Sequence, residues 1–252
     1  MSKNLRLLAA VALGLPALAL AGPSDYIRTP AVEYGEREID FKYGTEKMKP
    51  SEGGERDSAG STGFGYGATP WWFTEAYLKW HKESGDKSKY DAFEWENKFQ
   101  LTETNKYFVD VGLFTEIEIP RERREEGYEI AFGPLFQFDT GVIRWNANVF
   151  FERVVRSREE GAHPLEIGYQ LQAAYRLPSG GIDVGVQAFG EMGKWNDWEP
   201  REEQLHRIGP AIFGKVKLAE GRQALRYNAA FLFGETRATP RHTFRLQAEY
   251  EF

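Results

Sequence analysis

The chain has 252 residues, a formal net charge of −6 and no cysteine. The lack of cysteine excludes a disulfide scaffold, a Cys-ligated metal centre and a thiol nucleophile, and the acidic balance argues against a nucleic-acid partner. Aromatic residues make up 15% of the sequence and there are 26 glycines, a mixture that favours strands over helices.

Residues 1–21 have the pattern of a cleaved secretory signal peptide. Lys3 and Arg6 precede an apolar run from Leu7 to Leu20, and Ala19-Leu20-Ala21 is a small-x-small cleavage site. The run is short for a membrane-spanning helix, and no stop-transfer pattern follows it. We therefore expect an exported protein whose mature chain begins at Gly22. Residues 22–32 are expected to form a periplasmic N-terminal segment.

Residues 33–252 alternate between apolar and polar side chains, most regularly from Trp71 onward. Period two is typical of strands with one apolar and one polar face. The predicted strands are 33–44, 60–67, 71–82, 91–102, 106–118, 127–139, 142–154, 164–176, 181–192, 206–218, 223–235 and 242–252. Short and long connections alternate between them, which predicts an antiparallel sheet with short periplasmic turns and longer extracellular loops. The first two strands alternate less clearly, so ten strands is the alternative to twelve.

Strand length and the position of charge distinguish a membrane barrel from a soluble sandwich. Most predicted strands have about 11–13 residues, which suits a tilted strand that crosses a bilayer. Their apolar face is almost free of charge, and a charge there would cost roughly 2–4 kcal/mol at the bilayer midplane. Aromatic side chains gather near both ends of that face, as in membrane girdles. The main girdle candidates are Trp72, Trp80, Trp95, Tyr107, Tyr128, Trp145, Tyr175 and Tyr227.

The last strand carries a family resemblance. Its alternate positions Phe244, Leu246, Ala248, Tyr250 and Phe252 resemble the C-terminal assembly signal of Gram-negative outer-membrane β-barrel proteins. The resemblance implies an outer-membrane location and, as partners, outer-membrane lipid, the barrel-assembly machinery and periplasmic chaperones. Residues 66–72, YGATPWW, are similar to channel-like barrels grouped with a MetA-type phenol-degradation protein.

A barrel in lipid must close, because unpaired backbone groups at a sheet edge are too costly there. Strand 33–44 must then pair with strand 242–252. Arg37 falls on the apolar face of the first strand, which indicates either a position at the rim, where the side chain can snorkel, or a strand boundary that differs by about two residues.

The polar face predicts the lining of the lumen. Early strands contribute mainly acidic side chains: Glu75, Glu94, Glu96, Asp110, Glu116, Glu118 and Glu129. Later strands contribute mainly basic ones: Arg144, Arg176, Arg207, Lys215, Lys217, Arg226 and Arg245. Either these charges pair and close the lumen, or they line a narrow aqueous pore. Neither sign dominates, so a pore would have weak ion selectivity.

Signals for other chemistry are few. No serine, histidine and carboxylate are spaced as in a hydrolase, although the carboxylate pair Glu94 and Glu96 leaves acid–base chemistry open. The four histidines do not converge, so no metal site and no cofactor are expected. The loop from Arg121 to Glu126 is either a hydrated surface or a contact for lipopolysaccharide phosphates.

These patterns predict an all-β, single closed antiparallel barrel of about twelve strands over residues 33–252. The function that we expect is passive passage of small solutes through a narrow lumen. The alternative is a closed structural or surface-interaction barrel, and the third is an outer-membrane lipid-modifying enzyme. The patterns do not identify the solute or the role of the loop over residues 45–59.

Overall fold

The computed structural model describes residues 22–158, 161, 163–178, 180–218 and 223–252. The predicted signal peptide and its cleavage site lie outside these residues. The strands are β1 (Arg37–Lys47), β2 (Arg56–Thr69), β3 (Trp72–Lys82), β4 (Lys89–Gln100), β5 (Asp110–Pro120), β6 (Tyr128–Thr140), β7 (Ile143–Val155), β8 (Glu166–Tyr175), β9 (Ile182–Lys194), β10 (Asp197–Trp198), β11 (Leu205–Lys217), β12 (Ala224–Gly234) and β13 (His242–Glu251). A short 3-10 turn, Pro50–Glu52, lies between β1 and β2.

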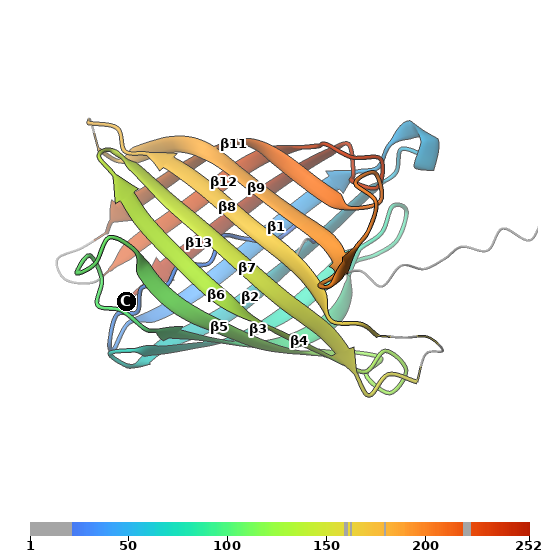
Figure 1. Cartoon of the computed structure of the whole chain (residues 1–252), viewed down its shortest axis with the longest axis horizontal. Coiled ribbons are helices and arrows are strands. Elements are labelled where there is room, and N and C mark those ends of the chain that lie inside the picture. The colour runs from blue at the N-terminus through green and yellow to red at the C-terminus, as the bar shows by residue number, and fades with distance from the viewer. Residues whose placement is uncertain (1–21, 159–160, 162, 179, 219–222) are drawn as a thin grey trace, which may run out of the picture.

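The strands form one closed antiparallel barrel (Figure 1). Neighbours in the sheet follow chain order, and β1 pairs with β13 to close it. The two-residue strand β10 extends only the end of β9. Twelve long strands therefore form the wall, which confirms the predicted fold class and the count of twelve rather than ten.

Side chains alternate between the barrel interior and its outer surface. On β1, Glu38, Asp40 and Lys42 are buried inside, whereas Ile39 and Phe41 are exposed outside. The other strands repeat this pattern, because successive side chains in a strand point to opposite faces. The result is an apolar outer belt around a polar interior, the arrangement that a barrel in lipid requires.

Among the described residues, no helix has the length and apolar character needed to cross a membrane.

The second strand begins at Arg56 rather than at residue 60, and two further predicted starts were wrong. The first strand begins at Arg37 rather than at residue 33, so Arg37 is the first residue of β1 and lies at the rim. The predicted strand 106–118 begins only at Asp110, and Tyr107 belongs to the connection between β4 and β5. Both strands keep their predicted parity, because the inward and outward faces depend on alternation and not on where pairing starts.

The barrel has a short-turn end and a long-loop end. The short-turn end contains the β2–β3 and β6–β7 connections and the end of β13. The long-loop end contains the β1–β2 and β9–β11 connections.

Candidate functional site

The barrel lumen contains the N-terminal segment of the described chain. Residues 22–32 are called the plug segment here. The sequence predicted a periplasmic position for it, but Asp25, Tyr26 and Arg28 are buried inside the barrel. The Tyr26 hydroxyl donates a hydrogen bond to Glu96 Oε2 at 2.5 Å, and Arg28 Nη2 donates to Glu96 Oε1 at 2.8 Å. The expected location was therefore wrong.

Opposite walls of the barrel hold the plug segment. Arg28 Nη2 also donates to Glu116 Oε2 on β5 at 3.0 Å. From β8, Gln170 Nε2 donates to Asp25 Oδ1 at 3.0 Å, and from β7, Asn148 Nδ2 donates to the Arg28 carbonyl at 2.8 Å. These contacts connect strands that are not neighbours in the sheet, so the plug segment bridges the lumen.

Aromatic and apolar side chains of the barrel wall also pack against the plug segment. The Arg28 guanidinium lies 4.2 Å from the ring centre of Phe114. Ile27 packs against an interior cluster that includes Phe189 and Phe213. Aromatic side chains on the inward face are unusual for an aqueous lumen and suit a segment packed within it. This inward apolar set was visible in the sequence and was the signal that could have located the plug segment.

The plug segment runs along the lumen towards the short-turn end. A Cβ atom added to Gly44, near the long-loop end of β1, would overlap the Pro23 carbonyl. Further along, the Val32 amide donates to Gln100 Oε1 at 2.7 Å, at the short-turn end of β4. The Gly35 amide then donates to the Gly67 carbonyl at 2.8 Å, and β1 begins two residues later.

The predicted lumen residues divide into two groups by burial. One group is buried in the barrel interior: Glu75, Glu94, Glu96, Asp110, Glu116, Glu118, Glu129, Arg207 and Arg245. The other group is only partly buried or exposed and lies near the short-turn end: Arg144, Arg176, Lys215, Lys217 and Arg226.

Four acidic side chains of the early strands, Glu94, Glu96, Glu116 and Glu118, bond cations of an early strand or of the plug segment. Lys79 Nζ bonds Glu94 Oε2 at 2.8 Å and also bonds Glu118. The plug segment compensates Glu96 and Glu116 through Arg28. On the other side, Lys215 Nζ lies 2.7 Å from Glu251 Oε2 and Arg207 Nη1 lies 3.4 Å from Glu46 Oε2. The two predicted walls of opposite sign therefore do not pair directly across the lumen at these positions.

A cavity of about 790 Å³ lies beside the plug segment, in the part of the lumen towards the short-turn end. It is called the vestibule here. Its lining combines plug residues with connection residues such as Asn105 and Gly181. Of the predicted lumen residues, it gathers Glu75, Glu96, Arg144, Lys215 and Arg226. Both signs of charge thus face this space.

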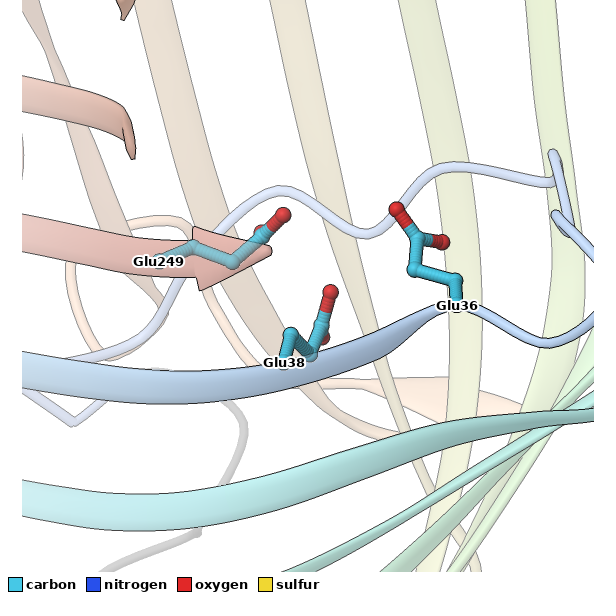
Figure 2. A group of neighbouring side chains, drawn as sticks. All are labelled: Glu36, Glu38 and Glu249. Atoms are coloured by element: carbon cyan, nitrogen blue, oxygen red, sulfur yellow. The ribbon is translucent and has the colours of Figure 1, made fainter. Parts of the chain in front are cut away.

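Among the described residues, two groups of three carboxylates bring their oxygens within 4.8 Å of one another and have the donor chemistry of a cation site. The first group is Glu94, Glu116 and Glu118, all buried. The second group is Glu36, Glu38 and Glu249, which Figure 2 shows directed towards a common space. Burial raises the pKa of the Glu36 carboxyl above its usual value, and the neighbouring Glu249 and Glu33 carboxylates act in the same direction against Lys98 and Arg226.

The outward residues lie where their parity predicted. Trp95, Trp145 and Tyr175 are exposed on the outer face. Trp72, Trp80, Tyr128 and Tyr227 lie on the same face and are partly buried, while Tyr107 is exposed in its connection. The residues of the predicted assembly signal alternate on the outer side of β13, between the inward Thr243, Arg245 and Gln247.

No family model matches the sequence, and no curated protein is significantly similar to it. Among solved structures, an outer membrane channel from Pseudomonas putida F1 has a TM-score of 0.58 and 11% identity, over 90% of this chain and 99% of that one. A double variant of OccD1 (OprD) has a TM-score of 0.38 and 12% identity, over 85% of this chain and 65% of that one. The first likeness shows a shared fold. The closed barrel with its apolar outer belt has the architecture of a membrane-spanning β-barrel.

Proposed function

We propose that the barrel is a narrow channel for the passive passage of small solutes, and that the plug segment controls its opening. One observation carries the proposal: a polar vestibule of about 790 Å³ lies next to a plug segment that hydrogen bonds and ion pairs hold in the lumen. The likeness to the Pseudomonas putida channel supports a transport role. Because both signs of charge line the vestibule, we expect weak ion selectivity.

The second candidate is a barrel that the plug segment closes permanently. The buried contacts of Arg28 with Glu96 and Glu116 favour it, since separating a buried ion pair is costly. In this case the protein would act through its surface and its loops, without transport.

We also propose that the assembly machinery recognises β13 through its outward apolar residues.

Single-channel recording in a planar bilayer tests the two candidates. We expect small, infrequent steps from the mature chain and larger, more frequent steps from the double variant Tyr26→Ala, Arg28→Met, which loses the main polar anchors of the plug segment. The variant Lys215→Met is the matched control, because it removes a lumen cation outside the plug contacts. If neither folded protein gives current steps, the closed barrel is favoured. The heat-dependent gel shift checks folding.

A further inference from the structure

The barrel wall holds the Arg28 side chain between two carboxylates. Glu96 on β4 and Glu116 on β5 lie directly opposite each other across the paired strands. Arg28 Nη2 donates to both of them, to Glu96 Oε1 at 2.8 Å and to Glu116 Oε2 at 3.0 Å. Like charges directly opposite each other destabilise an antiparallel strand pair. A cation between these two carboxylates therefore stabilises the pair.

Aromatic rings complete a cage around the same cation. The Arg28 guanidinium carbon lies 4.2 Å from the ring centre of Phe114 and 5.4 Å from that of Phe150. The two rings meet edge to face, at an angle of 81°. Both rings and both carboxylate residues are exposed by 3% or less. A planar guanidinium can stack on a ring while it donates hydrogen bonds, whereas an ammonium is a compact point charge.

The cage belongs to the wall, and its cation belongs to the plug segment. Glu96, Glu116, Phe114 and Phe150 lie on β4, β5 and β7, where pairing with neighbouring strands fixes their positions. Arg28 lies on a segment that side chains of the wall hold, for example through the Asn148 Nδ2 bond to its carbonyl at 2.8 Å. If the plug segment moves, Arg28 leaves and the cage stays. The wall thus contains a preformed site for a guanidinium group.

The vestibule gives a small solute access to this cage. Arg28, Glu96 and Phe114 line the vestibule, and the same cavity reaches Lys215 and Arg226 near the short-turn end. Its volume of about 790 Å³ is large enough for a small organic cation. A solute that enters from the short-turn end therefore meets the cage without first crossing the plug segment.

We propose that Glu96, Glu116 and Phe114 form a binding site for a solute that carries a guanidinium group, and that Arg28 fills this site while the plug segment is in place. The solute takes the place of Arg28 and so releases the plug segment. This inference names the solute class of the proposed channel and rests on that function only for passage. Binding and release are measured on the folded protein without transport, so their failure is distinct from a failure of conduction.

The variant Arg28→Ala empties the cage, and methylguanidinium is the probe that tests it. Saturation-transfer NMR of the mature chain in deuterated detergent follows the methyl signal of the probe. We expect one saturable site with a dissociation constant of about 0.1–10 mM, because a ligand of so few atoms gains a limited free energy of binding. Methylammonium and the neutral methylurea should bind at least about tenfold more weakly, since the first lacks a flat face and the second lacks a charge.

Two further variants distinguish the cage from the rest of the lumen. Arg28→Ala combined with Glu116→Gln removes one carboxylate and should weaken methylguanidinium binding by at least about tenfold. Arg28→Met is the matched control, because it removes the same cation but fills the cage with an unbranched apolar side chain. It should show no saturable binding. With folding verified by the heat-dependent gel shift, no saturable binding to Arg28→Ala, or equal binding to the double variant, would overturn the proposal.

Release of the plug segment is tested in a chain that keeps Arg28. The sequence has no cysteine, so a thiol introduced by Ser24→Cys reports on the plug segment alone. Because the tethered Arg28 competes at a millimolar effective concentration, we expect methylguanidinium above about 10 mM to raise the rate of N-ethylmaleimide reaction at this thiol by at least about threefold. Methylurea should leave the rate unchanged. Glu103→Cys, in the exposed β4–β5 connection, is the control thiol and should react equally with and without methylguanidinium. An unchanged rate at Ser24→Cys would overturn the proposal.

Discussion

The two halves of the lumen contain the same kinds of side chain and use them differently. In the half towards the long loops, Glu94 and Glu118 are buried and share Lys79. In the half towards the short turns, the Lys215 and Arg226 side chains are 41% and 48% exposed around the vestibule. The charged groups of the first half form buried ion pairs with one another. The basic groups of the second half remain accessible to water, ions and solutes.

The difference follows from solvation. A buried charge that loses its partner cannot be compensated by water, so breaking such a pair costs about 3–5 kcal/mol. An exposed pair is screened, and its loss costs about 0–1 kcal/mol. The plug segment runs through both halves, and its Arg28 joins the buried charges, since Arg28 bonds Glu96 and Glu116.

The largest expected effect is that of Arg28→Met on stability. The variant leaves Glu116 buried without the bond from Arg28 and leaves Glu96 with Lys42 Nζ at 3.8 Å as its remaining cation, so it should lower the free energy of unfolding by about 3–5 kcal/mol. Urea unfolding in detergent, followed by tryptophan fluorescence, measures the change. Arg28→Lys keeps the charge and should recover part of the loss. If Arg28→Met lowers the free energy of unfolding by less than about 1 kcal/mol, the Arg28 ion pairs behave like solvent-exposed pairs and not like buried ones.

Gly44→Ala is expected to have an intermediate effect on stability and on the open probability of the channel. The new methyl group would overlap the Pro23 carbonyl, and overpacking of this kind costs about 1–3 kcal/mol unless the neighbour moves. We expect the end of the plug segment to be displaced, with a higher open probability in bilayer recordings. Gly168→Ala is the control, because its new methyl group would meet the Gly190 carbonyl and not the plug segment. Identical recordings from Gly44→Ala and the unchanged chain would mean that this end does not restrict the lumen.

The smallest effect is expected for Lys215→Met. The Lys215 side chain is partly exposed, and the buried Glu251 keeps Arg226 as a second partner, so the free energy of unfolding should change by less than about 1 kcal/mol. The same urea titration measures it. A loss of unfolding free energy as large as that of Arg28→Met would show that the ion pairs of the two halves contribute equally to stability. The contrast between the halves would then be wrong.

Much of the wall could be predicted from local pattern. Alternation along residues 106–118 placed Asp110, Glu116 and Glu118 inside, and the structure buries all three. The starts of the first and fifth strands were harder to predict from the sequence. Alternation assigns a side chain to a face but does not say where pairing with the next strand begins. The charge pairs were harder still. Parity placed the acidic and basic walls, but it could not say that Lys79 would bond Glu94 rather than a residue of a later strand.

Sequence alone was sufficient for the export signal expectation, the strand parity, the closed barrel and the apolar belt, because each depends on neighbouring residues or on a repeat of period two. The position of the plug segment required the folded chain. Arg28 meets Glu116 across 88 residues of sequence and Gln170 across 142, and no local pattern encodes such distances. The convergence of Glu36, Glu38 and Glu249 likewise exists only once the first and last strands pair, since closing the barrel brings the two ends of the chain together.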